Sequence, residues 1–273
     1  MKKIGIISGK GSLPCLLAEE AKKQGYYVLM VALDPIADHL NGCADEIKRV
    51  NVGKLGRLIK VLKDAGITEA IMAGKVSKSL LYKSNIQPDM RAVKLLFKLK
   101  DKKDDTILQA ITEELKTEGI QIVETTCFAQ ELLMPEGVIT KTKPTTAIKK
   151  DIEFGYRIAL EIGRLDIGQT VVVKDRAVMA VEAIEGTDEA IRRGGGLAGS
   201  GAVVVKVAKP QQDFRYDVPV VGIETLKTMI QVKASTLAVE AARAIIVQKD
   251  EMIRLADRHN ISIIGITKDS LCC

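Results

Sequence analysis

The first half of the chain alternates short apolar runs with longer stretches in which apolar residues recur every three or four positions. The short runs predict strands at Lys3–Ser8, Tyr27–Leu33, Asp45–Asn51, Glu69–Ala73 and Ile120–Val123. The periodic stretches predict helices at Leu13–Gln24, Leu55–Asp64, Met90–Lys100 and Asp105–Thr117. Strands separated by helices at this rhythm indicate βαβ units, so we expect an α/β fold with a mostly parallel sheet.

A change of pattern near Met134–Pro144 divides the chain. The stretch MPEGVITKTKP carries proline near both ends with a glycine between, which is typical of a connection between domains. We therefore expect a Rossmann-like domain over residues 1–133 and a second domain over residues 134–273.

The second half predicts an α/β or α+β domain with a mixed sheet. Its expected strands are Thr170–Val173, Ala177–Glu182, Val203–Ala208, Val220–Gly222, Ala244–Val247 and Ile261–Ile266. Its expected helices are Thr145–Gly163, Thr187–Arg193, Ile223–Gln231 and Asp250–Asn260. Between them, Gly194–Gly201 holds five glycines and one serine, and is interpreted as a flexible loop.

Composition narrows the functional classes. Lys plus Arg total 41 against 35 for Asp plus Glu, and this excess suits anionic ligands or an anionic membrane surface. Aromatic residues are only 3% with no Trp, so platforms for stacking nucleic-acid bases are scarce. No apolar run approaches the roughly 20 residues that cross a bilayer, and the first residues do not resemble a signal peptide. We therefore expect a cytoplasmic protein.

Cysteine and histidine add little catalytic material. The five cysteines have no CxxC spacing, so in a cytoplasmic protein we expect free thiols. With only two histidines, a His-rich zinc site or a Ser-His-Asp triad is disfavoured.

A glycine-rich turn follows the first expected strand, at Ser8-Gly9-Lys10-Gly11-Ser12. Glycine lets the backbone approach a phosphate, and the following helix offers free N–H groups, so Gly9, Gly11 and Ser12 are candidate ligands of a diphosphate. The strict dinucleotide fingerprint fails because Pro14 replaces its third glycine, although Asp34 keeps an NAD-binding alternative open. A tight turn without a ligand is the structural alternative.

A second turn of this kind, Ala73-Gly74-Lys75-Val76-Ser77-Lys78, follows a later strand. We expect it at the same carboxyl edge of the sheet, where Gly74 and Lys75 would also face a ligand. Solvated loop charges are the alternative interpretation.

Late in the chain, acids and bases alternate between two prolines, in KPQQDFRYDVP. If this segment is extended, Asp213, Arg215 and Asp217 point to one side, which suits a divalent cation and a phosphate together. Lys209 precedes them. A structural ion pair in a loop is the alternative. A second acid set, Glu185-Gly186-Thr187-Asp188, is either a turn with a helix cap or a source of oxygen ligands.

These motifs together resemble the LpxI-type UDP-2,3-diacylglucosamine pyrophosphatases of lipid A biosynthesis. The resemblance covers nearly the whole chain and rests on GIISGKGSLP, MAGKVSK, KKDD, EIGRLDIGQTVVV, AVEAIEGTDEAIRR and VKVAKPQQDFRYDVPVVGIETL. It implies hydrolysis of the substrate pyrophosphate to UMP and 2,3-diacylglucosamine 1-phosphate.

The resemblance also implies site residues and partners. Asp217 carries over as the essential acid, with Asp213 and Arg215 beside it. Gly9, Gly11, Ser12, Gly74, Lys75, Thr187, Asp188 and Lys209 are the expected substrate-binding residues. Mg²⁺, or another divalent metal such as Mn²⁺, is expected near Asp217 with Asp213 or Glu185 assisting, and Asp217 is either a metal ligand or the base that orients water. A homodimer and loose peripheral contact with the inner face of the inner membrane are further expectations. The rival hypotheses are a non-catalytic module that binds a nucleotide sugar or lipid, and an NAD-dependent oxidoreductase.

Overall fold

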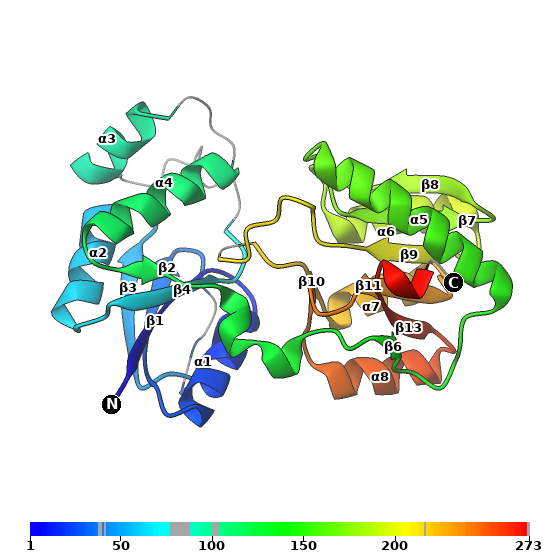
Figure 1. Ribbon diagram of the computed structural model, residues 1–273, viewed down its shortest axis with the longest axis horizontal. Helices are drawn as coiled ribbons and strands as arrows, with labels where there is room; N and C mark the ends of the chain where they lie inside the picture. The colour runs from blue at the N-terminus through cyan, green and yellow to red at the C-terminus, as the bar shows by residue number, and fades with distance from the viewer. Residues whose placement is uncertain (38–39, 41, 77–87, 100–103, 216, 272–273) are drawn as a thin grey trace. The chain divides into compact units, whose positions relative to one another are not determined.

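The computed structural model describes residues 1–37, 40, 42–76, 88–99, 104–215 and 217–271. It divides into two compact units (Figure 1). The first contains Met1–Ala129 together with Phe214 and Arg215. The second contains Gln130–Asp213 and the chain from Asp217 onward. A two-domain α/β fold, with a parallel sheet followed by a mixed sheet, is confirmed.

The first unit is a parallel sheet covered by helices on both faces. Its elements are β1 (Lys3–Ser8), α1 (Leu13–Lys23), β2 (Tyr27–Asp34), β3 (Glu46–Asn51), α2 (Leu55–Asp64), β4 (Glu69–Ala73), α3 (Met90–Phe97), α4 (Asp104–Thr117) and β5 (Gln121–Ile122). The strand order is β3-β2-β1-β4-β5, and every pairing is parallel. The direction of winding reverses between β1 and β4, which is where open α/β sheets bind their ligands.

Alternating side chains of the strands supply the two halves of this core. Leu29 and Val31 of β2 lie in one buried cluster with Leu62 of α2 and Leu115 of α4. The helix α1 packs on β1 and β2 instead, and buries Leu17, Ala18 and Ala21 (Figure 1). Both faces are therefore sealed from water, as parallel sheets require.

One expectation for this unit is wrong. Cys15 of α1 and Cys43, in the connection from β2 to β3, form a disulfide bond with their Cα atoms 5.3 Å apart. Since β2 and β3 are parallel, their connection must return along the length of the sheet, and the return brings Cys43 to α1. Among the described cysteines, Cys127 is free and exposed.

The second unit is a three-layer domain. Its strands are β6 (Gly137–Val138), β7 (Thr170–Lys174), β8 (Ala177–Val181), β9 (Val203–Lys206), β10 (Val220–Val221), β11 (Thr236–Glu240), β12 (Ile245–Ile246) and β13 (Ser262–Ile266). Its helices are α5 (Thr146–Arg164), α6 (Thr187–Ala198), α7 (Ile223–Gln231) and α8 (Lys249–Arg258). The main sheet has the order β6-β13-β11-β9-β7-β8, and β10 pairs separately with β12. Within the main sheet β9, β11 and β13 are parallel, while β6, β7 and β8 run antiparallel to their neighbours.

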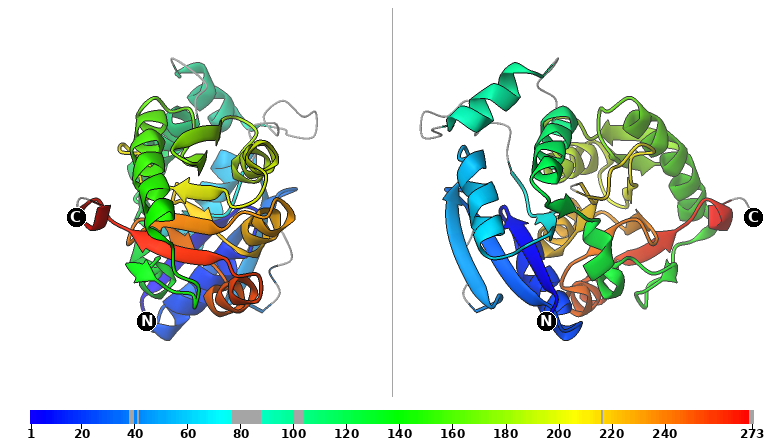
Figure 2. Two further views of the ribbon diagram at one scale, coloured as in Figure 1. Left: turned by 90° about the vertical axis from the view of Figure 1, so that its right-hand side faces the viewer. Right: turned by 60° about the vertical axis from the view of Figure 1, so that its left-hand side comes forward.

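Two clusters of buried side chains hold these layers together. Ile152, Tyr156 and Ala159 of α5 pack on one face of the sheet. On the other face, Ile191 of α6, Leu226 of α7 and Met252 of α8 share a second cluster with strand residues. The left view of Figure 2 shows α5 on one side of the sheet and the other three helices opposite.

Two elements of this unit differ from the expected ones. The strand β11 was not expected, although it lies between β9 and β13 near the middle of the sheet. Residues 134–144 were expected to form a connection, yet they contain β6, and Met134 is only 1% exposed. Three short 3₁₀ helices, Thr125–Phe128, Gln130–Leu132 and Asp269–Leu271, complete the described structure. None of the helices in the described part of the chain combines the length and apolarity needed to span a bilayer.

The glycine-rich segment Gly194–Gly201 is also not a loop over its whole length, because α6 continues through it to Ala198. The reason is packing. A Cβ on Gly194 would lie 2.6 Å from Cβ of Val172, and one on Gly195 would clash with Val232. These glycines therefore let α6 approach both the sheet and α7, at a cost in helix propensity.

This packing predicts opposite effects for two alanine substitutions in α6. Gly194→Ala should lower the free energy of unfolding by about 1–3 kcal/mol, because the new methyl group overpacks the core. Gly196→Ala should raise it by about 0.5–1 kcal/mol, because a Cβ there meets nothing within 4 Å and alanine favours the helix. Urea unfolding of the two variants tests this, and equal effects would show that Gly194 is not tightly packed.

Candidate active site

The two glycine turns of the first unit lie against each other where the winding reverses. The N–H of Gly9 donates to the carbonyl oxygen of Ala73 at 2.8 Å, and Lys10 and Lys75 exchange two backbone hydrogen bonds of 2.8 and 3.0 Å. A Cβ on Gly9 would lie 2.8 Å from the Lys75 oxygen, so only glycine fits this approach. The sequence prediction that both turns share one edge is consistent with this pairing. Ser77 and Lys78 lie outside the described residues.

The mutual pairing changes what these turns can offer a ligand. The N–H groups of Gly9, Lys10 and Lys75 donate to carbonyl oxygens within the fold, so they do not serve an anion. Gly11 has a φ of 110°, and a Cβ on it would meet nothing within 4 Å. Ser12 is the N-cap of α1 and makes no side-chain cap hydrogen bond. The start of α1 also carries the positive end of the helix dipole.

Asp34, the acid that kept NAD binding open, is already paired. Its Oδ1 accepts a hydrogen bond from Nη1 of Arg49 at 2.7 Å. In dinucleotide-binding folds the corresponding acid holds a ribose hydroxyl. The ion pair therefore does not favour the NAD hypothesis.

In the second unit, polar side chains gather at the carboxyl edge of the parallel strands. Lys206 ends β9 opposite Thr170, the first residue of β7, and Glu240 ends β11. Glu182 follows β8, and its N–H donates to the Thr170 oxygen at 2.8 Å. The antiparallel strands thus bring Glu182 to the edge at which the parallel strands end.

A buried hydrogen-bond chain connects three of these elements. Nζ of Lys206 donates to Oγ1 of Thr187 at 2.9 Å, and Thr187 donates to Oε1 of Glu182 at 2.8 Å. Lys206 is 5% exposed and Glu182 8% exposed. Two opposite charges are therefore held in the interior through one hydroxyl group, an arrangement that is stable only while each group keeps its partner.

Glu240 forms a second buried acid at the same edge. Its Oε2 accepts the N–H of Ala208 at 2.7 Å, and Nε of Arg243 lies 3.7 Å from its Oε1. Burial raises the pKa of the Glu240 carboxyl, against the lowering effects of the Ala208 hydrogen bond and the Arg243 charge. The acid therefore fixes the backbone just where the chain leaves β9 for the motif with the two prolines.

The segment between these prolines is not extended, contrary to expectation. The N–H of Asp217 donates to the carbonyl oxygen of Asp213 at 3.1 Å, which closes a turn, so the residues do not alternate as in a strand. Asp213 and Asp217 lie at the two ends of this turn and belong to the second unit, whereas Arg215 belongs to the first. The N–H of Thr125 donates to the carbonyl oxygen of Phe214 at 3.1 Å, a hydrogen bond between two residues of the first unit.

Gln212 positions Asp217 within this turn. Its Oε1 accepts the N–H of Lys209 at 2.8 Å, and its Nε2 donates to Oδ2 of Asp217. The side chain of Lys209 is 18% exposed, and its Nζ donates to Oδ1 of Asp166 at 2.6 Å. Gln212 was not among the expected site residues. In the sequence it is one of two neighbouring glutamines, and a neutral amide does not by itself indicate a catalytic or metal-binding role.

The second acid set divides between two environments. Oε1 of Glu185 accepts a hydrogen bond of 2.6 Å from Arg193, and this bond holds the pKa of Glu185 below its ordinary value. Asp188 lies in the first turn of α6, and its buried Oδ1 has no hydrogen-bond partner among the described residues. Thr187 is already part of the buried chain described above.

The arrangement of acidic side chains can be compared with what the expected Mg²⁺ ion requires. Among the described residues, no three His, Cys, Asp or Glu side chains come together as a ready-made metal site. Mg²⁺ usually takes one or two carboxylates and completes its shell with waters and substrate phosphates. The turn bearing Asp213 and Asp217 offers one or two carboxylates, which fits binding of Mg²⁺ together with waters and substrate phosphates. It does not fit a site in which protein side chains supply every ligand.

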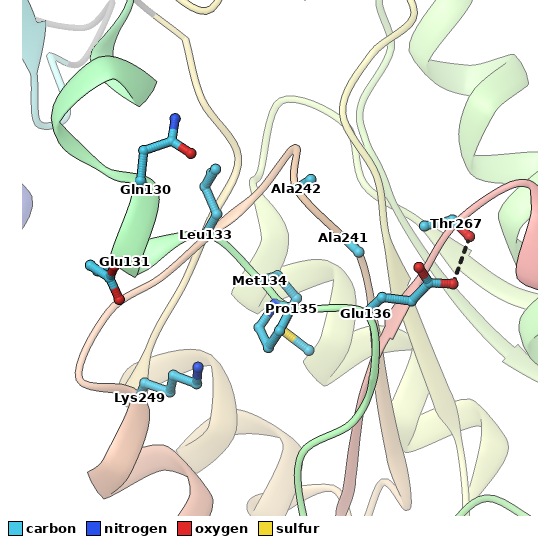
Figure 3. A pocket seen from close by; sticks show the side chains of 10 residues that line it. All are labelled: Gln130, Glu131, Leu133, Met134, Pro135, Glu136, Ala241, Ala242, Lys249 and Thr267. Atoms are coloured by element: carbon cyan, nitrogen blue, oxygen red, sulfur yellow. Dashed lines mark hydrogen bonds between the residues drawn. The ribbon is translucent and has the colours of Figure 1, made fainter.

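A cavity of about 380 Å³ opens beside the ends of β11 and β13 (Figure 3). Its lining comprises Gln130, Glu131, Leu133, Met134, Pro135, Glu136, Ala241, Ala242, Lys249 and Thr267. Thr267 donates to Glu136 at 3.1 Å on its wall (Figure 3). None of the expected site residues lines it, so the cavity is not assigned to the reaction.

Comparison with known proteins shows which family the chain belongs to. The LpxI N-terminal domain matches residues 3–132, and the LpxI C-terminal domain matches residues 135–264. The chain belongs to the LpxI family. A curated member, the UDP-2,3-diacylglucosamine pyrophosphatase LpxI of Caulobacter vibrioides, is 34% identical over 97% of this chain and 98% of its own length.

Solved structures contribute less. A GalE-like L-threonine dehydrogenase from Cupriavidus necator is 19% identical over 43% of this chain and 34% of its own, with a TM-score of 0.28. The C-terminal domain of a coenzyme A biosynthesis bifunctional protein CoaBC is 16% identical over 44% of this chain and 74% of its own, with a TM-score of 0.25. Likenesses this weak carry no argument for the fold or function of an LpxI family member.

The buried hydrogen bonds from Lys206 to Thr187 and from Thr187 to Glu182 predict how substitutions of Thr187 change stability. Thr187→Val keeps the shape but leaves Lys206 and Glu182 without their shared hydroxyl group, so the free energy of unfolding should fall by about 1–3 kcal/mol. Thr187→Ser retains the hydroxyl and should lose clearly less. Chemical unfolding of both variants measures the difference, and equal losses would mean that the hydroxyl contributes nothing.

Proposed function

We propose that this chain hydrolyses the pyrophosphate bond of UDP-2,3-diacylglucosamine to UMP and 2,3-diacylglucosamine 1-phosphate. The observation that carries the proposal is its 34% identity, over nearly the whole of both chains, with a pyrophosphatase of that name. Both LpxI domains are matched, so the second unit with its acidic turn is included in the likeness.

The acidic turn supports a direct role for Asp217. In this reaction the oxygen of a water molecule forms a bond to one phosphorus, the bond from that phosphorus to the bridging oxygen breaks, and the water loses a proton. A carboxylate held by Gln212 can orient that water and accept its proton. The Asp213 carboxylate, on the same turn, is the second acid proposed to act there.

Basic side chains of the segment KPQQDFRYDVP are proposed to hold the diphosphate. Arg215 can bind two phosphate oxygens at once, and Lys209 adds a point charge whose position Asp166 sets. In the first unit, Gly11 and Ser12 at the start of α1 are the proposed phosphate contacts, with Gly9, Gly74 and Lys75 shaping the turn. Thr187 and Asp188 are proposed substrate contacts at the start of α6.

Mg²⁺, or Mn²⁺, is the proposed cofactor, held by Asp217 together with phosphate oxygens of the substrate. When bound, such an ion neutralises the diphosphate and lowers the pKa of a coordinated water. Glu185 would have to leave Arg193 before it could assist, so its metal-binding role is the less supported part of this proposal. On the basis of the family resemblance we also propose that the protein is a homodimer. Analytical ultracentrifugation would test this by measuring the mass of the protein in solution.

Removing the Asp217 carboxylate tests the catalytic assignment. Asp217→Asn should lower kcat by about 10²–10⁴-fold, because a positioned acid–base group contributes that much. Binding of UMP or of the lipid phosphate, followed by calorimetry, should persist. Asp250→Asn, which alters an exposed aspartate, is the matched control and should keep full activity. Unchanged turnover in Asp217→Asn would defeat the assignment, and bound substrate without any UMP release by the unaltered protein would instead favour a binding module.

Metal removal tests the cofactor. Complete chelation with EDTA should abolish UMP release, and added Mg²⁺ or Mn²⁺ should restore it. Because the described residues form no ready-made metal cage, the apparent affinity for the ion should rise when the diphosphate is present. Full activity of the metal-free protein would rule out the metal role while leaving the hydrolysis itself in place.

A further inference from the structure

The segment that leads to the proposed catalytic turn leaves the sheet at the end of β9. The N–H of Val207 still donates to a backbone oxygen, that of Gln169, at 3.0 Å. The N–H of Ala208 donates instead to a side chain, at Oε2 of Glu240, over 2.7 Å. Ala208 is only 1% exposed, so its N–H needs a partner within the protein. The Glu240 carboxylate therefore sets the course of the chain at the point where strand pairing stops.

Glu240 is itself held firmly by the sheet. It is the last residue of β11, which lies between β9 and β13 (Figure 1). Val239, the residue before it, pairs with Lys206 of β9. Glu240 pairs with Ile266 of β13, and the N–H of Ala241 donates to the Ile266 oxygen at 2.8 Å. A carboxylate at this place is therefore a fixed point for the segment that follows β9.

A short run of contacts leads from Ala208 to Asp217. The N–H of the next residue, Lys209, donates to Oε1 of Gln212 at 2.8 Å, and the N–H of Gln212 donates back to the Lys209 oxygen at 2.9 Å. Nε2 of the same Gln212 donates to Oδ2 of Asp217. A shift of the backbone at Ala208 therefore also moves the amide that orients the proposed catalytic acid.

Two other side chains tie the segment to the end of α5. Nε2 of Gln211 donates to the Gly163 oxygen at 2.9 Å, and Nζ of Lys209 donates to Oδ1 of Asp166 at 2.6 Å. Both are contacts of long side chains, and both are less buried than the hydrogen bond between Glu240 and Ala208. Because Glu240 acts directly on the backbone, it is better placed to fix the direction of the segment.

Burial disfavours the charged form of Glu240. The side chain is 8% exposed, and burial raises the pKa of its carboxyl, because a charge is poorly stabilised away from water. An apolar side chain would avoid that cost but would leave the Ala208 N–H without an acceptor. The task of the carboxylate at this edge is therefore to hold that N–H.

We infer that Glu240 is a positioning residue for the hydrolysis, because the backbone that it holds at Ala208 sets the orientation of the Asp217 carboxylate. The inference rests on the proposed function, which assigns the attacking water to Asp217. In this scheme Glu240 touches neither the substrate nor the water, and its effect reaches the reaction only through Gln212. Its loss should therefore change kcat more than KM.

Steady-state kinetics of the full-length protein test the inference. Glu240→Met removes the acceptor and should lower kcat about 10–10²-fold with a smaller change in KM, because a misplaced acid orients water poorly. Glu240→Gln keeps an acceptor oxygen on a side chain of the same length. It should recover most of the kcat that Glu240→Met loses.

Asp151→Leu is the matched control. Asp151 is 7% exposed and, like Glu240, accepts backbone N–H groups, those of Asp175 and Arg176 at 3.0 and 2.7 Å. These two residues form the turn between β7 and β8, at the opposite edge of the sheet from the end of β9. Asp151→Leu should lose stability to urea as Glu240→Met does, yet keep the kcat of the unaltered protein.

Hydrogen exchange gives a measurement that needs no catalysis. In Glu240→Met the backbone amides of residues 208–215 should exchange with deuterium faster than in the unaltered protein, because their anchor is lost. In Asp151→Leu the faster exchange should be found at residues 175–176 instead.

The positioning role is overturned if Glu240→Met keeps its kcat, if Asp151→Leu loses as much kcat, or if Glu240→Gln is no more active than Glu240→Met. Failure of the proposed function gives a different result. The unaltered protein would then release no UMP, while the difference in exchange at residues 208–215 would remain.

Discussion

Parallel strand pairing is the constraint on which the rest of this protein depends. Two parallel strands cannot be joined by a tight hairpin, so each connection must return along the outside of the sheet. In the first unit, α1 returns over one face while α2 and α4 cover the other. In the second unit, α5 and the layer of α6, α7 and α8 seal the two faces in the same way. With both faces dry, polar chemistry is confined to the edges, and the glycine turns and acids are found there.

Each edge then uses a different device to hold its polar groups. The first unit uses backbone approach: Gly9 and Gly74 are close enough that a side chain at either would overlap the other turn. The second unit uses partnered charge: Thr187 lies between Lys206 and Glu182, and Gln212 lies between Lys209 and Asp217. The hydroxyl group of Thr187 thus separates two opposite charges, and the amide of Gln212 orients the Asp217 carboxylate. Such groups set geometry without neutralising the carboxylate that the proposed reaction needs.

The helix α3 stands apart from this scheme. Elsewhere in the described structure, helices bury an apolar face against a sheet, whereas α3 is attached through a cap and an arginine and turns apolar residues outward.

The order of strands and helices in the first unit follows from the sequence, because each element there has a clear period and ends at a glycine or a polar turn. The motif residues Asp213, Asp217, Gly9 and Gly74 were singled out from the sequence because glycine turns and paired acids point to phosphate chemistry by residue type, and their role stays a prediction. The strand β11 was missed because its sequence, TLAVE, has only three apolar residues and no distinguishing period, and only pairing with β9 and β13 makes it a strand. The glycines of α6 indicated a loop because local propensity cannot register the close approach of Val172. The partners of the acids, Gln212 and Thr187, lie only five residues from Asp217 and Glu182, but residue type alone does not predict those contacts. The bond between Cys15 and Cys43 was decided by tertiary structure, because 28 residues separate the two cysteines along the chain.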